Sequence, residues 1–135
     1  METTTFELRT GDRFGVHDLT GRINDWLRDR GDGLCHVFLP HATAGLALIE
    51  TGAGSEQDLQ TALERVLPRD DDLWQHRHGS AGHGGDHVLP AFVAPFLVLA
   101  VEGGALVLGT WQSVVLVDSN VDNVTRTVRL SLLRG

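Results

Sequence analysis

Apolar and polar residues alternate along much of this chain with a period of two, the pattern of half-buried β-strands. The first such run surrounds Phe6 and Leu8, which share one face. The run over residues 96–118 is expected to turn as a hairpin at Gly103 and Gly104 and then to continue as one long strand. Further strands are predicted over residues 33–40, 42–50 and 125–133, with a short extended piece after the turn at residues 11–15.

Two windows follow the helical period instead. The first lies near residues 18–30 and is followed by Gly31, which suits the position just past a helix end. The second lies near residues 55–66, where Ser55 and Asp58 have the spacing of a capping box. The expected buried stripes are Leu19, Ile23, Trp26 and Leu27 in the first helix, and Leu59, Leu63 and Val66 in the second.

Strands and helices are segregated along the chain rather than alternating, which favours an α+β fold over a parallel α/β fold. The 135 residues contain neither an internal repeat nor a linker-like segment, so we interpret residues 1–135 as one domain. The sequence therefore predicts a single compact domain with a largely antiparallel sheet core and two main helices.

Composition and charge argue against several classes of function. The formal net charge is -7 at pH 7, and such a surface repels nucleic-acid backbones, so general nucleic-acid binding is not expected. The start of the chain lacks the segments of a signal peptide, and no window has the length of a membrane span. Cys35 is the only cysteine, which fits a cytoplasmic protein; it is expected to be a small buried hydrophobe rather than a nucleophile.

The segment HRHGSAGHGGDH, residues 76–87, carries four of the seven histidines and no apolar side chain larger than that of Ala81. On a glycine-rich loop, imidazoles with this spacing can converge on one point, and zinc is the divalent metal that best suits neutral imidazole. Asp86 and the run Asp70–Asp72 could add oxygen ligands or orient a histidine ring. The alternative is a solvated loop without function, but the density of histidine and glycine favours a functional loop.

A second candidate is PHATAGLALIE, residues 40–50, in which His41 and Thr43 lie in a turn before an apolar strand that ends at Glu50. His41 could act as acid, base or metal ligand, and Thr43 with the neighbouring amides could hold an anion. Gly45 allows the backbone to approach a ligand closely. The alternative is a plain β-turn in which Thr43 satisfies the backbone, and the spacing alone favours neither.

Two polar residues interrupt apolar strand segments. Gln112, in the segment GTWQS, would need hydrogen-bond partners in a core, because an unsatisfied buried amide costs about 1–3 kcal/mol. Trp111 beside it is expected to be a core or subunit contact. Arg126 falls on the apolar face of the last strand, so it requires an anion. That anion is a carboxylate such as Glu50 or Asp118, or the phosphate of a ligand, with the structural ion pair favoured.

These segments together resemble the YjbQ-like family, whose members are often labelled secondary thiamine-phosphate synthases. The family's H-T-T-A-G-L-T-I-N-E segment corresponds to HATAGLALIE, residues 41–50, and its G-T-W-Q segment corresponds to residues 109–112. Between them, the family's G-N-A-H-S-H-L segment corresponds to GHGGDHV, residues 82–88. The resemblance covers nearly the whole chain, from about Thr4 to Leu133, with the segments in the family's order.

The chain departs from the family pattern at several positions. His87 matches the second histidine of the family's pair, but Gly85 stands where the first is found, and His83 stands where the family has asparagine. The ligand set is therefore expected to be shifted by two residues rather than lost. Ala42 and Ile49 replace a threonine and an asparagine of the first segment, which removes polar contacts that bear on the choice of substrate.

The resemblance implies a compact α+β fold with a β-sandwich-like core, assembled as a homotrimer with sites near the subunit boundaries. It also implies a pocket for a phosphate-bearing small molecule and a divalent metal. The thiamine-phosphate synthase label implies condensation of an aminopyrimidine pyrophosphate with a thiazole phosphate, with release of pyrophosphate. The principal enzymes of that reaction are (β/α) barrels, a fold that this chain does not have, so the activity is expected to be secondary to phosphate binding.

The expected function is thus that of a small cytoplasmic enzyme in which the loop at residues 76–87 folds back over the turn at His41. Zinc is the expected metal, and replacing His76 is expected to matter less than replacing His87. The alternatives are a trimeric binding protein that uses the same residues without catalysis, and a purely structural trimer. The predicted site residues are His41, Glu50 and His87 for catalysis, Thr43, Gly45, Gln112 and Arg126 for ligand binding, and His41, His83 and His87 for the metal.

Overall fold

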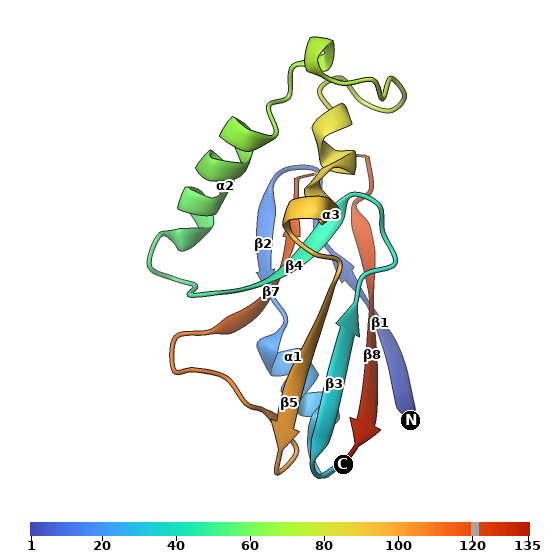
Figure 1. Ribbon diagram of the computed structural model, residues 1–135, viewed down its shortest axis with the longest axis vertical. Helices are drawn as coiled ribbons and strands as arrows, with labels where there is room; N and C mark the ends of the chain where they lie inside the picture. Colours follow the sequence, from blue (N-terminus) through green and yellow to red (C-terminus); the bar gives the residue numbers. More distant parts are fainter. Residues whose placement is uncertain (120–121) are drawn as a thin grey trace.

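The computed structural model describes residues 1–119 and 122–135, and there the fold is α+β, as the sequence predicts. The strands form two antiparallel sheets, one in the order β1-β8-β3-β5-β6 and one in the order β2-β7-β4 (Figure 1). The first sheet contains β1 (Glu2–Arg9), β3 (Gly33–Phe38), β5 (Phe96–Glu102), β6 (Ala105–Leu106) and β8 (Thr125–Arg134). The second contains β2 (Gly15–Asp18), β4 (Ala44–Ile49) and β7 (Ser113–Asp118).

The helical elements lie between these strands in the sequence. The described helices are α1 (Thr20–Leu27), α2 (Ser55–Val66) and the short α3 (Leu89–Phe92), with 3-10 turns η1 (Asp71–Leu73) and η2 (Gly84–His87). None of them is long and apolar enough to cross a membrane.

The two sheets pack face to face, and β7 shows how the core is divided. Val114 and Leu116 point into the main core, which also holds residues of β3, β5 and β8. Val115 and Val117 point the other way, into a second apolar cluster that includes Leu89. The second sheet is therefore covered on both faces, and this is why β7 is a continuous apolar run rather than an alternating one.

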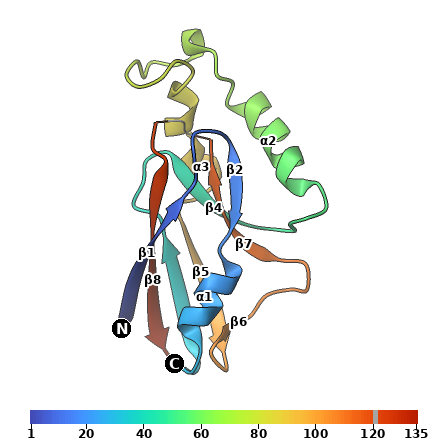
Figure 2. The same ribbon diagram turned by 180° about the vertical axis from the view of Figure 1, so that it is seen from behind.

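Helix α1 covers the main core from behind the first sheet (Figure 2). Leu19, Ile23 and Leu27 are almost completely buried, which confirms the predicted stripe. The helix is shorter than the predicted window of residues 18–30, because Asp29 adopts a left-handed φ of 64° and the helix ends at Leu27.

Helix α2 has the predicted range, but the predicted side-chain capping is absent and the predicted stripe is less buried than expected. Gly54 is the N-cap and no side chain caps the helix, so the expected Ser55–Asp58 capping box is absent. Val66 is 53% exposed, and Leu59 and Leu63 are only partly buried. The reason is that α2 lies along the edge of the second sheet, where a single apolar cluster contacts it (Figure 1).

The segment from β5 to β7 corrects another prediction. The hairpin turn at Gly103 and Gly104 is confirmed, with β5 paired to β6. The expected long strand is not formed, because the chain leaves the first sheet after Leu106 and re-enters a strand of the second sheet at Ser113. The connecting segment is exposed, and Trp111, at 73% exposure, is not a core residue.

Cys35 lies in β3 with its side chain in the main core. Burial raises the pKa of its thiol to about 11, so the thiolate is disfavoured at neutral pH. The expectation that Cys35 is a small core residue is confirmed.

The loop of residues 76–87 lies at one end of the sandwich, and both chain ends lie at the other (Figures 1 and 2). The same end of the molecule also carries the β3–β4 connection and the start of β8, as Figure 1 shows. The fold thus brings together three segments that are far apart in the sequence.

Candidate functional site

A cavity of about 400 Å³ opens where these three segments meet. Residues 40–43 of the β3–β4 turn form one side, together with the residues from 122 to Arg126 at the start of β8. His78, Gly79, His83 and His87 of the histidine loop form the other side. We call these sides the strand wall and the loop wall. The loop does therefore fold back over the turn at His41.

Arg126 anchors the strand wall and is only 1% exposed. Its Nε and Nη2 donate to the two carboxylate oxygens of Asp118 at 2.7 and 3.0 Å, and Nη2 also donates to the hydroxyl of Thr43 at 2.8 Å. Thr10 donates a further hydrogen bond to Asp118. Of the two carboxylates considered from the sequence, Asp118 is thus the partner of Arg126.

His41 also belongs to the strand wall. Its Nε2 accepts a 2.8 Å hydrogen bond from the backbone N–H of Thr127, so the neutral ring carries its proton on Nδ1. Burial lowers the pKa of His41, and the nearby Arg126 guanidinium lowers it further. Because Nε2 is already engaged, it is not available to a metal in this arrangement.

Three imidazoles of the loop converge beside the cavity. Each of His76, His83 and His87 offers one nitrogen, and these nitrogens all lie within 4.8 Å of one another. The Nε2 atoms of His83 and His87 are 2.7 Å apart, and the rings of His76 and His87 stack with centroids 3.8 Å apart. We call these residues the histidine triad.

Two members of the triad, His76 and His87, favour the neutral imidazole. Burial lowers the pKa of His76 and of His87, and the neighbouring histidine rings lower both further. Nδ1 of His76 is buried and has no hydrogen-bond partner among the described residues. Neutral rings with lone pairs directed at one point are the form in which histidine binds metals.

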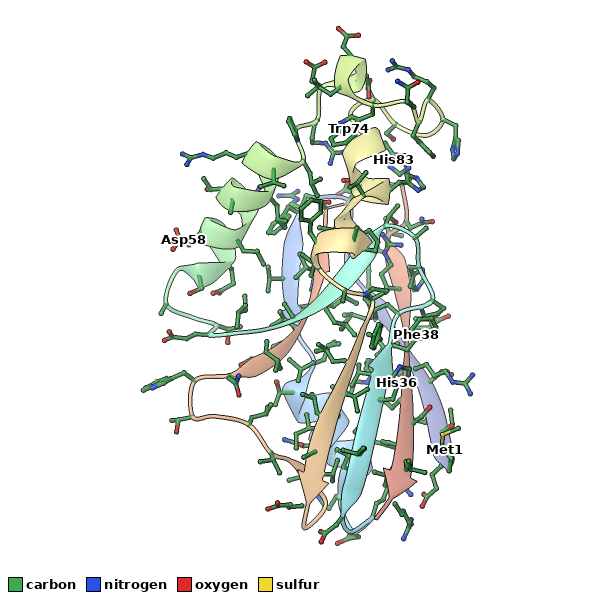
Figure 3. All side chains as sticks on the ribbon, viewed as in Figure 1. Met1, His36, Phe38, Asp58, Trp74 and His83 are labelled. Carbon is green, nitrogen blue, oxygen red and sulfur yellow. The ribbon has the colours of Figure 1, made fainter. Side chains whose placement is uncertain are left out.

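The loop is held by polar contacts from the preceding segment. Trp74 donates from its indole nitrogen to the carbonyl of Pro68, and Asp71 accepts from the backbone N–H of Gly82. Figure 3 shows Trp74 and His83 at the same end of the molecule, opposite Met1. Asp71 therefore supports the loop backbone.

The acidic residues named from the sequence take different roles. Asp70 accepts from the backbone N–H of Asp72 and caps η1. Asp86 is only 3% exposed, and its Oδ2 lies 3.3 Å from Nδ1 of His83. Asp122, which the sequence gave no reason to select, has Oδ2 3.1 Å from the same nitrogen. Asp122 follows β7 by several residues and lies far from the loop in sequence, so only the folded structure reveals its contact with His83.

Three of the predicted site residues lie elsewhere. Glu50 follows β4, is exposed, and does not line the cavity. Gln112 is exposed as well, and its side-chain oxygen accepts from the backbone N–H of Gly109, so it closes the local turn. Gly45 is buried because its backbone packs against Val93: a Cβ there would lie 2.0 Å from the Val93 carbonyl oxygen.

The expected metal set of His41, His83 and His87 also changes. His76 takes the place of His41 in the triad, because the Thr127 amide occupies Nε2 of His41. The sequence left open only which loop histidine stands in for the missing partner of His87 and did not place His76 in the metal set. His87 and His83 remain together, and both line the cavity with His41, Thr43 and Arg126.

The chain is similar in sequence to known proteins over nearly its whole length. The family model described as "UPF0047 protein YjbQ-like" matches residues 4–135. The chain belongs to this family. A UPF0047 protein of Mycobacterium tuberculosis is 55% identical over 135 residues, covering 100% of both chains. The UPF0047 protein YjbQ of Escherichia coli is 28% identical over 125 residues, covering 90% of this chain and 89% of that protein.

Solved structures show the same fold. A hypothetical protein from Aeropyrum pernix is 31% identical, with a TM-score of 0.87 over 100% of both chains. A protein from Sulfolobus solfataricus, described as YbjQ-like and of unknown function, has a TM-score of 0.86 at 21% identity and covers 99% of this chain and 97% of that one. The family and the fold are thus established, and the names of these relatives assign no activity.

Proposed function

We propose that this protein is a small cytoplasmic metalloenzyme that binds a phosphate-bearing small molecule in the cavity between the strand wall and the loop wall. The observation that carries the proposal is the convergence of three imidazole nitrogens, within 4.8 Å of one another, beside a cavity that also contains Arg126. A metal and a cationic side chain at one cavity suit an anionic substrate.

The triad fits a divalent metal, and zinc suits it best. Zinc prefers tetrahedral nitrogen ligands at about 2.0–2.1 Å, which places two ligand nitrogens about 3.3 Å apart. The Nε2 atoms of His83 and His87 are 2.7 Å apart, so a shift of a few tenths of an ångström on each side would accommodate the ion. Three protein ligands leave one position open, as in catalytic rather than structural zinc sites. A bound zinc ion would polarise a phosphoryl oxygen or lower the pKa of a bound water molecule.

The strand wall offers the anion site. Among the described residues, no hydrogen bond of Arg126 uses Nη1, although the residue lines the cavity. The hydroxyl of Thr43 accepts from Arg126, so its own proton can be donated to a ligand oxygen. His41, with its proton on Nδ1, can donate a hydrogen bond to a ligand oxygen but, as a neutral ring, does not supply a proton to a leaving group.

The reaction that these groups suit is the departure of phosphate or pyrophosphate from a small molecule, by electrostatic stabilisation rather than covalent catalysis. Thiamine-phosphate synthesis is one reaction of this class, and we propose it only as a secondary activity of the pocket. Non-enzymatic binding of a metal and a small ligand is the second candidate function. The exposed position of Glu50 favours it, because the carboxylate expected to transfer protons is outside the cavity.

We also propose a homotrimer, with the subunit number taken from the family resemblance. The outer face of the first sheet exposes Leu34, Phe96, Val98 and Leu133, with exposures from 47% to 59%. Contact between subunits would remove this apolar surface from water. Light scattering should give three times the 14.7 kDa chain mass, and a monomer at micromolar concentration would contradict the assembly.

The test of the site compares three proteins. Zinc content after purification and zinc affinity by chelator competition are measured for the parent, for His87→Ala, and for His36→Ala, whose ring lies on the sheet among Phe38 and Phe96. The parent and His36→Ala should bind one zinc ion per chain, and His87→Ala should lose it. Equal zinc and inorganic-phosphate binding by all three would place the site elsewhere. Release of phosphate from 4-nitrophenyl phosphate or pyrophosphate by the zinc-loaded parent, lost in His87→Ala, separates an enzyme from a binding protein.

A further inference from the structure

Asp86 is a buried carboxylate, and both of its oxygens accept hydrogen bonds from other side chains. Arg69 donates to both of its oxygens, from Nη1 at 2.9 Å and from Nη2 at 3.3 Å. The hydroxyl of Ser119 donates to Oδ1 at 2.8 Å. These three contacts come from two residues, Arg69 shortly after α2 and Ser119 directly after β7, so they fix the carboxylate relative to both of these elements.

The orientation of Asp86 directs one oxygen at the histidine triad. Oδ2 lies 3.3 Å from Nδ1 of His83, and that nitrogen is on the opposite side of the ring from Nε2, which faces His87. An ion pair between Arg69 and Asp86 that served stability alone would not require the imidazole of His83 beside Oδ2. A carboxylate behind a histidine is the arrangement that orients metal-binding rings in proteins.

Asp122 approaches the same nitrogen from the side of the strand wall. Its Oδ2 is 3.1 Å from Nδ1 of His83 and accepts from the backbone N–H of Ser80, while its Oδ1 accepts from the Ser80 hydroxyl. Neither carboxylate meets the angular requirement of a hydrogen bond, since Nδ1 forms none with the described residues. The ring of His83 therefore lies between two negative groups, and a small rotation brings its N–H onto either one.

We infer that Asp86 and Asp122 are positioning residues for the metal site, and that Asp86 is the more important because Arg69 and Ser119 hold it in place. Their charges keep the proton of His83 on Nδ1, so that the lone pair of Nε2 points at the metal. Arg69 acts through Asp86 and does not touch the metal. This inference rests on the proposed metal site but concerns residues that the ligand set does not contain.

The expected effect is a change in metal affinity. Loss of a carboxylate that supports a metal-binding histidine lowers metal affinity about 10–100-fold. Asp86→Asn should fall in this range, because the amide keeps the shape but loses the charge. Asp122→Asn should lose less, and Ser119→Ala, which removes one of the contacts to Asp86, less again.

The experiment measures zinc affinity by chelator competition for the parent, Asp86→Asn, Asp122→Asn and Ser119→Ala. The control is Asp72→Asn, an exposed carboxylate in η1 that should bind zinc as the parent does. A second readout is the tautomer of His83 in the metal-free proteins, from long-range proton–nitrogen NMR correlations. It should be the Nδ1–H form in the parent and in Asp72→Asn, and a mixture of both forms in Asp86→Asn.

The outcomes separate this inference from the proposed function. If the parent does not bind zinc, the metal site fails, and the tautomer of His83 still tests the positioning role. If the parent binds zinc and all carboxylate variants bind it equally with an unchanged tautomer, the positioning role is overturned. If Asp86→Asn does not fold, Asp122→Asn and Ser119→Ala decide, and parent-like affinity and tautomer in both would overturn the inference.

Discussion

The two walls of the cavity are built in opposite ways. On the strand wall, Arg126, Asp118 and Thr43 are almost fully buried and satisfy one another through short hydrogen bonds. On the loop wall and in the histidine triad beside it, imidazole nitrogens face one another, and Nδ1 of His76 lacks a hydrogen-bond partner among the described residues. A polar group that the fold already satisfies contributes to structure, whereas convergent unsatisfied groups indicate a ligand.

The difference follows from the local sequence. The strand wall is set by strand register, since Arg126 pairs with Leu8 across the first sheet and its side chain must enter the core. The loop wall is set by glycine, because Gly79 and Gly82 adopt left-handed φ values of 88° and 78°. The strand wall should therefore control stability, and the loop wall should control metal binding.

The sharpest contrast is between Arg126→Leu and His87→Ala. Removing Arg126 leaves Asp118 buried without its cation, and breaking a buried pair in this way costs about 3–5 kcal/mol. His87→Ala should change the free energy of unfolding by less than about 1 kcal/mol, because it lies on a partly exposed loop. Urea unfolding of the metal-free proteins measures both. Arg129→Leu, on the exposed face of the same strand, is the control and should match the parent.

A smaller difference in stability is expected when a methyl group is added to a closely packed glycine in β4 or in the histidine loop. In Gly45→Ala the new methyl group would lie 2.0 Å from the backbone oxygen of Val93, so the strand must shift, at a cost of about 1–3 kcal/mol. In Gly85→Ala, on the loop, the nearest atom is Cζ2 of Trp74 at 3.3 Å, and a slight movement of the ring suffices. Urea unfolding should rank Gly45→Ala as the more destabilised variant, and the reverse order would show that the backbone of the loop is packed more tightly than that of β4.

The sequence predicted most of the fold because its signals are local. Periods of two and of 3.6 residues locate the strands and both main helices, and burial confirms the stripe of α1. The failures concern long-range packing. The stripe of α2 is only partly buried, with Val66 exposed, and the run from Phe96 to Asp118 is divided between two sheets, because an apolar run does not reveal which sheet it joins.

The site was predicted less well, for a related reason. Its two walls come from segments that the sequence analysis selected, and Arg126 pairs with Asp118 as favoured. Glu50 and Gln112 belong to the two segments that carry the family resemblance, but the structure places both outside the cavity. The roles of Arg69, Ser119 and Asp122 depend on contacts across 17 to 42 residues, for which one sequence has no signal.

Acid should weaken the folded protein through two partly buried histidines. Burial lowers the pKa of His17 and of His41 in the folded state, whereas an unfolded histidine has a pKa of about 6.5. The unfolded state therefore binds more protons below that pH, so stability is complete above about pH 6.5 and is lost as the pH falls through the folded-state pKa. Urea unfolding in the presence of a chelator, at about pH 7.5 and about pH 5.5, should show the loss. His17→Gln should flatten the profile, and greater stability at the acid pH would contradict the assignment.

The smallest effect is expected for Glu50→Gln and Gln112→Ala, which test whether the cavity ends where the two walls end. Both residues are exposed and neither lines the cavity. Glu50→Gln should leave zinc affinity, phosphate binding and the free energy of unfolding unchanged, within about 0.5 kcal/mol for the last. Gln112→Ala removes one hydrogen bond to the Gly109 amide and should likewise affect only the local turn. A loss of phosphate binding in either variant would mean that the active cavity includes residues that a single chain does not bring together. The trimer would then be required to complete the site, and dilution to monomers should abolish phosphate binding in the parent as well.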